Sequence, residues 1–228
     1  MVYLSRFLYR DRVDAGQTLA KKLREYADRA DVLVLGLARG GIPVAYEVAS
    51  ALNASLDVFL VRKLGVPGQE ELAMGAIASG GVRVLNDDVL RHLSLGADDV
   101  DRVASLETQE LARREREYRG ERAPTQISGR TVILIDDGLA TGATMRAAAQ
   151  AVQAQHPARL IVAVPVAANE TCEEFRNLVD EVVCALTPEP FYAVGLWYEN
   201  FYQTSDEEVR SLLARRPQPQ PLPARLKG

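Results

Sequence analysis

Residues 131–145 read Thr-Val-Ile-Leu-Ile-Asp-Asp-Gly-Leu-Ala-Thr-Gly-Ala-Thr-Met, and this stretch decides the fold. Its apolar part, 132–135, has the length and the β-branched side chains that are typical of a buried parallel strand. Asp136 and Asp137 follow at the carboxyl end of that strand, where open α/β sheets bind their ligands. A turn of small residues, 138–143, then leads into an alanine-rich helical stretch. The sequence therefore predicts a strand, an acidic pair, a turn and a helix around one ligand site.

The turn after the strand has the composition of a phosphate-binding loop. Four of its positions have almost no side chain that would obstruct a phosphate group: Gly138, Ala140, Gly142 and Ala143. The amides of residues 140–144 can point into one cavity at the N-terminus of the following helix, which favours anions. Thr141 and Thr144 add hydroxyl donors. The alternative interpretation is an ordinary strand–turn–helix connection in which Asp136 and Asp137 act as N-cap groups.

The segment resembles the 5-phosphoribosyl-1-pyrophosphate (PRPP) motif of type I phosphoribosyltransferases. That motif consists of an apolar strand, two acidic residues, two variable positions, a small or acidic residue, Thr, Gly, any residue, and Thr or Ser; every position is filled here. By this resemblance Asp136 and Asp137 are catalytic residues that hold the ribose 2- and 3-hydroxyls, directly or through magnesium-bound water. The resemblance also implies a 5-phosphate-binding loop, which consists of Ala140, Thr141, Gly142, Ala143 and Thr144. Mg²⁺ is the implied cofactor, held indirectly through PRPP, Asp136 and Asp137.

A second strand followed by a glycine turn lies closer to the N-terminus. Residues 31–37 form an apolar run, and Ala38-Arg39-Gly40-Gly41 comes directly after it. This turn resembles the short loop that binds pyrophosphate in type I phosphoribosyltransferases, which implies that Ala38, Arg39 and Gly40 contact that group. Arg39 can donate to phosphate oxygens, and the glycines let the backbone approach closely. Because Arg-Gly-Gly alone is a weak motif, an exposed arginine beside a turn is the alternative.

The segment 61–71 leaves an apolar strand and becomes rich in glycine, proline and charged residues, which predicts a mobile loop. Type I phosphoribosyltransferases carry a flexible loop near this point that closes over PRPP and excludes water. By the same resemblance, Arg62 would bind the pyrophosphate and Lys63 would be a catalytic cation. Glu70 or Glu71 would supply a proton-transfer group in this interpretation, whereas a solvated run of charges is the alternative.

The alternation of strand and helix patterns predicts an α/β fold with a doubly wound, mostly parallel sheet of the type I phosphoribosyltransferase kind. The expected strands of the sheet are 31–37, 55–61, 130–136, 159–166 and 181–186, and 74–78 and 82–85 look like short strands that interrupt this alternation. The expected helices are 17–29, 42–52, 143–154, 170–178 and 206–213. The expected domains are a core of residues 1–85 and 122–228, a helical insert at 86–121, a C-terminal hood at about 187–205, and a proline-rich tail at 216–228.

Aromatic residues gather near the C-terminus, where six of them lie between positions 191 and 202. The resemblance implies that the hood covers the base-binding site, and Trp197 and Tyr198 are the expected contacts of the acceptor base. Packing of these rings in the core or in a dimer interface is the alternative. In the insert, glutamates are interleaved with the arginines of 113–119, which favours a solvated face; contact with RNA or a partner subunit is the alternative.

Composition and charge argue against several classes of protein. The formal net charge of −4 gives no general attraction to nucleic acid or to an anionic membrane, so we expect neither as a partner. No apolar run approaches the length of a transmembrane helix and no signal peptide is recognisable, so the sequence predicts a cytoplasmic protein. The two histidines lie in no metal or hydrolase motif, which argues against a zinc enzyme. Cys172 and Cys184 lack metal-ligand spacing, and we expect a buried free thiol at Cys184.

The resemblance implies a phosphoribosyltransferase, that is, a glycosyltransferase of nucleotide metabolism and nucleotide salvage. It would move 5-phosphoribose from PRPP to an acceptor nitrogen, expected on a nucleobase, and release pyrophosphate. Ala140 stands where enzymes that act on hypoxanthine and guanine usually carry Asp, which argues against a standard 6-oxopurine mechanism. The expected partners are PRPP, a small-molecule acceptor and a second copy of the chain in a homodimer. The alternative function is a non-catalytic PRPP-binding regulator that contacts a partner or nucleic acid through the insert.

Overall fold

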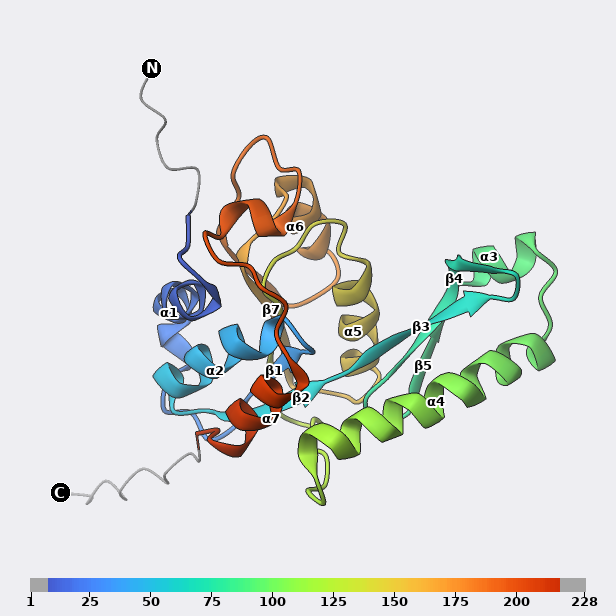
Figure 1. Ribbon diagram of the computed structural model, residues 1–228, viewed down its shortest axis with the longest axis horizontal. Coiled ribbons are helices and arrows are strands. Elements are labelled where there is room, and N and C mark those ends of the chain that lie inside the picture. Colours follow the sequence, from blue (N-terminus) through green and yellow to red (C-terminus); the bar gives the residue numbers. More distant parts are fainter. Residues whose placement is uncertain (1–7, 218–228) are drawn as a thin grey trace.

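The computed structural model describes residues 8–217, without the side chains of Glu70 and Glu71, and centres on a five-stranded parallel sheet (Figure 1). The order across this sheet is β2 (Ser55–Phe59), β1 (Val32–Leu37), β6 (Thr131–Ile135), β7 (Arg159–Val166) and β8 (Glu181–Leu186). In β1, Gly36 lies opposite Val58 on one side and Ile135 on the other. The prediction of a doubly wound, mostly parallel sheet is confirmed. Most of the predicted tail, 218–228, lies outside the described residues.

Helices cover both faces of the sheet, because successive residues of each strand point to opposite sides. On β1, Val32 and Val34 lie in one apolar core with α1 (Arg12–Lys22), α2 (Gly41–Leu52) and α7 (Asp206–Ala214). Leu33 and Leu35 lie in the other core, with α5 (Ala143–Gln153) and α6 (Asn169–Phe175). All residues of β1 are buried, as a central strand covered on both faces requires. Among residues 8–217, no helix is long and apolar enough to cross a membrane.

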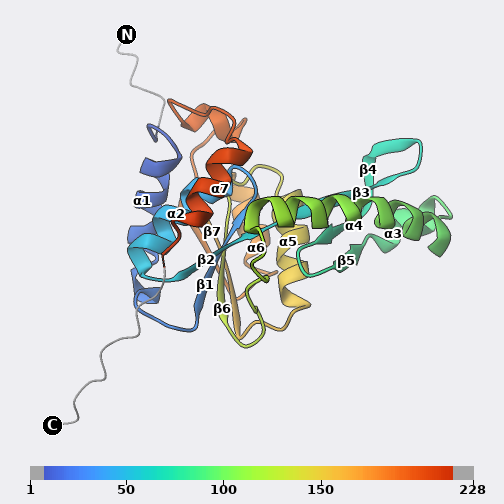
Figure 2. The ribbon, with the colours of Figure 1, turned by 60° about the horizontal axis from the view of Figure 1, so that its bottom comes forward.

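A second, antiparallel sheet projects from the core (Figures 1 and 2). It consists of β3 (Val61–Val66), β4 (Gln69–Ala78) and β5 (Val82–Leu85), and we call it the ribbon. The long helix α4 (Ala97–Arg119) lies along the ribbon, and the short helix α3 (Asp87–His92) lies toward its far end. The prediction of a loop at 61–71 is wrong, because Leu64 and Met74 are buried in one cluster with Val100 and Ala104 of α4. Because α4 covers these side chains, the segment pairs as the two antiparallel strands β3 and β4.

Two other boundaries differ from the sequence prediction. Helix α1 begins at Arg12 rather than at residue 17, because the Asp11 side chain caps it by accepting a hydrogen bond from the Asp14 backbone N–H at 2.9 Å. It ends at Lys22 and is followed by a short 3-10 turn, η1 (Arg24–Tyr26). The strand expected at 55–61 is divided into β2 and β3, so that one chain segment contributes to both sheets.

The two cysteines form a disulfide bond between α6 and β8, so the prediction of a free thiol at Cys184 is wrong. Cys172 and Cys184 are separated by 12 positions in the sequence, and their Cα atoms lie 6.6 Å apart. The chain turns back after α6 and enters β8 beside it, which brings the two side chains together. Residue spacing alone gave no signal for this pairing.

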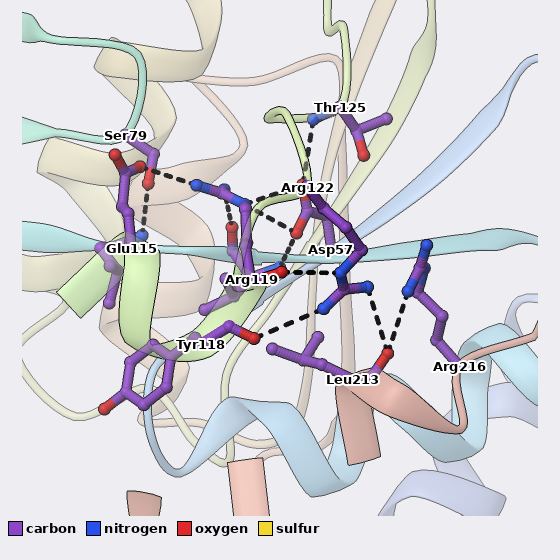
Figure 3. Close-up of polar contacts among 11 residues, drawn as sticks. Asp57, Ser79, Glu115, Tyr118, Arg119, Arg122, Thr125, Leu213 and Arg216 are labelled. Carbon is purple, nitrogen blue, oxygen red and sulfur yellow. Dashed lines mark hydrogen bonds and ion pairs between the residues drawn. The ribbon is translucent and has the colours of Figure 1, made fainter. Parts of the chain in front are cut away.

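A buried ion pair anchors the C-terminal end of α4 to the core (Figure 3). Arg119 Nε donates to both carboxylate oxygens of Asp57 on β2, at 3.0 and 3.2 Å, and Nη2 donates to the Val58 carbonyl oxygen at 2.7 Å. Asp57 also accepts from the backbone N–H of Thr125 at 3.0 Å, and Glu115 accepts from Arg119 Nη1 at 2.9 Å. All three charged side chains are therefore paired, and α4 is fixed to an edge strand of the parallel sheet.

Candidate active site

The two loops singled out from the sequence lie at the carboxyl edge of the parallel sheet, where the strand order reverses between β1 and β6. One loop, 38–41, follows β1 and begins with a cis peptide bond between Ala38 and Arg39. The other loop, 136–144, follows β6 and leads into α5. Ligands of open α/β sheets bind in the crevice at this kind of reversal.

Glycines bring these two loops into direct contact. A Cβ atom at Gly40 would lie 2.2 Å from Oδ2 of Asp137, and one at Gly41 would lie 2.6 Å from the carbonyl oxygen of Ile135. Neither position has room for a side chain. The Gly-Gly pair in the first loop is thus explained by its contact with the acidic pair in the second.

The acidic pair keeps one oxygen of each carboxylate open. Asp136 Oδ1 accepts a hydrogen bond from the backbone N–H of Asp137 at 2.9 Å. Asp137 Oδ2 accepts a hydrogen bond from Arg12 Nε at 2.8 Å, and Arg12 Nη2 lies 2.7 Å from the same oxygen in an ion pair. In the part of the chain that the structure describes, no donor reaches the second oxygen of either side chain. Two carboxylate oxygens therefore remain available to a ligand.

Burial and charge act differently on the two acids. Removal from water raises the pKa of Asp136 well above its usual range, and the negative charge of Asp137 raises it further. Burial also raises the pKa of Asp137, but the Arg12 guanidinium opposes that rise. Of the two acids, Asp136 therefore has the more strongly raised pKa.

The small-residue loop 140–144 borders a cavity of about 160 Å³ next to the acidic pair. Asp136 and Val194 also line this cavity. The last two residues of the loop, Ala143 and Thr144, are the first two of α5, so the loop amides lie at a helix N-terminus, where the helix dipole favours an anion. Thr141 and Thr144 are exposed and can add their hydroxyl groups.

Helix α6 supports this loop from the side of the core. Thr171 Oγ1 donates to the Ala140 carbonyl oxygen at 2.6 Å. Gly142 has a left-handed backbone conformation (φ +73°), and a Cβ atom there would lie 2.7 Å from the Phe175 ring. The conformation and the contact both require glycine.

Arg39 lies in the first loop with its side chain turned toward α7. Its Nη1 is 3.6 Å from Oδ1 of Asp206, the first residue of that helix. The Tyr118 hydroxyl at the end of α4 donates to the same oxygen, and this hydrogen bond, together with the charge of Arg39, lowers the pKa of Asp206. Helices α4 and α7 therefore meet the loop 38–41 in one charged cluster.

Arg62 and Lys63, the two cations expected to reach PRPP, point to opposite sides of β3. Arg62 forms an ion pair with Glu107 of α4, which places it on the side of the ribbon that faces that helix. Lys63 lines a second cavity of about 560 Å³, which also includes Thr144 of the phosphate-type loop. Among the described residues, Lys63 has no acidic partner. The structure thus brings Lys63, and not Arg62, toward the loop 140–144.

Tyr198 is buried and does not present its ring to a ligand. Only 1% of the residue is exposed, and its ring packs against those of Tyr9 and Phe201, with ring centroids 5.5 and 5.0 Å away. Its hydroxyl donates to the backbone carbonyl oxygen of Asp137 at 2.6 Å, and burial raises its pKa. Its contact in this structure is with the acidic pair, whereas we expected a contact with the acceptor base.

Trp197 is partly buried in the predicted hood, where it stacks on Phe191 with ring centroids 6.2 Å apart. Its indole N–H is buried and has no hydrogen-bond acceptor within residues 8–217. Trp197 closes the 3-10 turn η2 (Val194–Trp197), whose first residue touches the acidic loop: a Cβ atom at Gly138 would lie 2.4 Å from Val194 Cγ1. Val194 of this turn lines the cavity beside the loop 140–144, whereas Trp197 lines neither this cavity nor the larger one that contains Lys63.

The sequence did not reveal three residues of this site, namely Arg12, Thr171 and Val194. Each reaches the two loops from a distant part of the chain; Arg12, for example, lies 125 positions before Asp137. Arg12 did carry one weak signal, because a cation in the first turn of a helix interacts unfavourably with the helix dipole. Thr171 and Val194 carried none.

The donor set fits Mg²⁺ only together with a substrate. Among the described residues, no group of three or more His, Cys, Asp or Glu side chains could hold a metal ion. Mg²⁺ commonly keeps several waters and is bound through one or two carboxylates plus substrate phosphates. The open oxygens of Asp136 and Asp137 match that description.

Comparison with known proteins gives consistent matches. A family model described as a phosphoribosyl transferase domain matches residues 8–195. Two provisionally named phosphoribosyl transferases of Mycobacterium tuberculosis, from strains CDC 1551 and H37Rv, are each 50% identical over 208 residues, which are 91% of this chain and 47% of theirs. The chain thus spans about half the length of these curated relatives. The crystal structure of TT1426 from Thermus thermophilus has a TM-score of 0.81 and 42% identity, covering 92% of this chain and 99% of that one.

Proposed function

Because the chain belongs to the phosphoribosyl transferase domain family, we propose that it transfers 5-phosphoribose from PRPP to an acceptor nitrogen and releases pyrophosphate. The observation that carries this proposal is the meeting of the acidic pair, the loop 140–144 and the loop 38–41 at one edge of the sheet. A phosphosugar diphosphate has three polar parts, and this edge offers one group of residues to each of them.

The loop 140–144 would bind the 5-phosphate with its amides and threonine hydroxyls. The open oxygens of Asp136 and Asp137 would accept hydrogen bonds from the ribose hydroxyls. The loop formed by Ala38, Arg39 and Gly40 would bind the pyrophosphate. Fixing these three parts holds carbon 1 of the ribose in a defined position relative to the acceptor, and such positioning lowers the entropic part of the barrier.

During transfer the bond between carbon 1 and the pyrophosphate oxygen breaks, a bond to the acceptor nitrogen forms, and the ribose ring gains positive charge. Mg²⁺, when bound with PRPP, would neutralise charge on the departing pyrophosphate. Lys63 would add a positive charge from the ribbon, because it lines the cavity that contains Thr144. Arg39 would do so from the loop 38–41 after exchanging Asp206 for a pyrophosphate oxygen. Since Arg62 is paired with Glu107, we give it no role in binding.

For the acceptor, we propose a nucleobase other than a 6-oxopurine, and a place for the enzyme in nucleotide salvage. Ala140 provides no carboxylate to accept a proton from a purine ring nitrogen. Val194 lines the cavity and would supply an apolar contact on the hood side of the site, and Trp197 ends the same 3-10 turn. A homodimer is compatible with the exposed apolar side chains of the same segment, among them Leu196 and Tyr202.

The alternative of a PRPP-binding regulator gains little support from the insert. Of the arginines in α4, Arg113 and Arg114 pair with glutamates of the same helix, and Arg119 pairs with Asp57 and Glu115. These side chains are engaged within the protein, so the basic face that contact with RNA would need is largely neutralised.

The test is mass spectrometry of the purified protein after incubation with PRPP, Mg²⁺ and a mixture of purine, pyrimidine and pyridine bases. The matched control carries Asp136→Asn and Asp137→Asn. We expect a new nucleoside monophosphate that the control does not form, and its mass identifies the acceptor. PRPP binding without any product would favour the regulator, and the absence of PRPP binding would refute both functions.

A further inference from the structure

We propose that Arg12 is a positioning residue that joins the ribose-binding acid to the hood. It holds the Asp137 side chain in place and, with the same guanidinium group, holds the segment 201–202 beside it. This inference rests on the proposed function, because its consequence is a change in PRPP binding.

On the side of the acidic pair, Arg12 fixes one carboxylate oxygen and leaves the other open. Nε donates to Asp137 Oδ2 at 2.8 Å, and Nη2 lies 2.7 Å from the same oxygen in an ion pair. Gly40 encloses the same oxygen, since a Cβ atom there would lie 2.2 Å from Oδ2 and 3.5 Å from Arg12 Nη2. Oδ2 is thus held between the loop 38–41 and the guanidinium. The charge-assisted hydrogen bond and the ion-pair contact together select one side-chain orientation of Asp137.

On the other side, Arg12 is attached to the end of the hood segment. Its Nη1 donates to the Tyr202 carbonyl oxygen at 2.7 Å, and the guanidinium carbon lies 4.0 Å from the centroid of the Phe201 ring. The Phe201 ring packs in turn on Tyr198, whose hydroxyl donates to the Asp137 backbone. The hood is therefore connected to Asp137 by two routes, one through Arg12 and one through Tyr198.

The placement of Arg12 is costly unless these contacts need it. Its side chain is 11% exposed, and it lies in the first turn of α1, where the helix dipole disfavours a cation. Arg10, two positions earlier, provides the contrast. Its side chain is 75% exposed and its nearest carboxylate, on Asp14, is 3.8 Å away. Arg10 therefore serves as a matched control from the same segment.

The geometry has a direct consequence for binding. When the open oxygen of Asp137 accepts a ribose hydroxyl, Arg12 holds that carboxylate in the receiving orientation. The same guanidinium transmits the position of Asp137 to residues 201–202, next to Trp197 and Tyr198. Lysine would keep the charge but lacks the planar guanidinium that bonds Asp137 and Tyr202 at the same time, so it would restore only part of the function.

The experiment measures PRPP affinity by titration calorimetry with Mg²⁺ in the wild type and in Arg12→Gln, Arg12→Lys and Arg10→Gln. Because charge-assisted hydrogen bonds are lost, we expect Arg12→Gln to weaken binding by about tenfold to a hundredfold. Arg12→Lys should fall between this variant and the wild type, and Arg10→Gln should stay within about twofold of the wild type. Trp197 is the single tryptophan, so its fluorescence reports on the hood. PRPP should change its emission in the wild type, and Arg12→Gln should lose this response even at saturation.

A second variant, Phe201→Leu, protects the test against a folding defect of Arg12→Gln. It keeps the Arg12–Asp137 pair and removes the ring below the guanidinium, so we expect about two- to fivefold weaker PRPP binding and a smaller fluorescence response. PRPP binding of wild-type strength in Arg12→Gln would overturn the inference and leave the proposed function intact, as would an unchanged tryptophan response. Equal losses in Arg12→Gln and Arg12→Lys would also overturn it. If the wild type itself does not bind PRPP, the proposed function fails and the inference fails with it.

Discussion

A buried carboxylate faces an arginine at two places: in the Arg119–Asp57 ion pair that anchors α4, and in the Arg12–Asp137 pair of the candidate active site. The two carboxylates differ in how many of their oxygens accept hydrogen bonds from the protein. Asp57 accepts hydrogen bonds on both oxygens, from Arg119 and from backbone N–H groups. Asp137 accepts from Arg12 on one oxygen, and Asp136 accepts a single backbone N–H. A buried carboxylate that lacks partners costs free energy, and a proton or a ligand can supply what the protein leaves out. We therefore expect the Arg119–Asp57 pair to stabilise the fold and the acidic pair, Asp136 and Asp137, to bind a ligand.

The largest effect on stability should come from breaking the Arg119–Asp57 ion pair. We expect Arg119→Met to lower the free energy of unfolding by about 3–5 kcal/mol, because it leaves Asp57 buried without its counter-charge. Urea unfolding measures the loss. The double variant Arg119→Met with Asp57→Leu should recover most of it, since no unpaired charge remains. A loss below about 1 kcal/mol in the single variant would show that water reaches Asp57 and that the two regions do not differ in this way.

At the acidic pair of the candidate active site, removing a charge should stabilise the protein and reduce its activity. Asp136→Asn should reduce transfer activity by about a hundredfold to a thousandfold, because it removes a charge that faces the reacting ribose. In buffer without PRPP and Mg²⁺ the same change should raise the melting temperature by about 2–5 °C at neutral pH, since a neutral amide replaces a buried charge.

The pH dependence of this gain has a definite sign. The folded state raises the pKa of Asp136 above its ordinary value of 3.8, so the wild type is most stable, with respect to this group, below that pH. It loses that stability as the pH rises through the folded pKa. Calorimetric melting at several pH values should therefore show the Asn variant gaining most at neutral pH and nothing below about pH 4. A variant that is less stable than the wild type at pH 7 would contradict this account.

A smaller effect should follow from loosening the phosphate-type loop. Thr171→Val removes the hydrogen bond to the Ala140 carbonyl oxygen, which should raise the KM for PRPP by about three- to tenfold with little change in kcat. Steady-state kinetics with the acceptor found by mass spectrometry checks this. Thr171→Ser keeps the hydroxyl group and should behave like the wild type. If both variants fall equally, the methyl group of Thr171 and not its hydroxyl supports the loop.

The smallest effect is expected on the exposed face of α4. The Arg113 side chain is 57% exposed and pairs with Glu110 and Glu117, whereas Arg119 on the same helix is 5% exposed. Arg113→Gln should therefore leave the melting temperature and PRPP binding unchanged within error. A clear loss of stability or of binding would show that this face takes part in an interface.

The sequence predicted those parts of the molecule in which neighbouring residues act together. The strand, the acidic pair and the turn of 131–144 form one continuous pattern, and the loop 38–41 follows the same logic after β1. The parallel sheet could be predicted because apolar runs alternate with helical stretches at regular spacing. These local patterns predict the elements correctly because the spacing of apolar residues within each element matches the face that it buries.

What the sequence could not predict depends on contacts between distant positions. The residues of 61–71 are rich in turn formers, yet α4 converts them into strands by covering Leu64 and Met74. An aromatic cluster is compatible with a base site and with a core, and the burial of Tyr198 follows from its contacts with Tyr9 and Phe201. In the sequence, Asp57 and Asp137 are each a carboxylate within or directly after an apolar strand. Only the tertiary structure shows that Asp57 accepts hydrogen bonds on both oxygens and Asp137 on one.

The contacts of Arg12 join distant parts of the sequence, because its partners Asp137 and Tyr202 lie 125 and 190 positions later. During synthesis the chain emerges N-terminus first, so Arg12 leaves the ribosome long before either partner exists. A nascent chain that has just passed residue 144 already contains every residue of the PRPP motif but lacks the segment that completes the Arg12 contacts. Ligand binding would then require the chain to extend past residue 202, and truncation before that residue should remove it while leaving most of the parallel sheet in place.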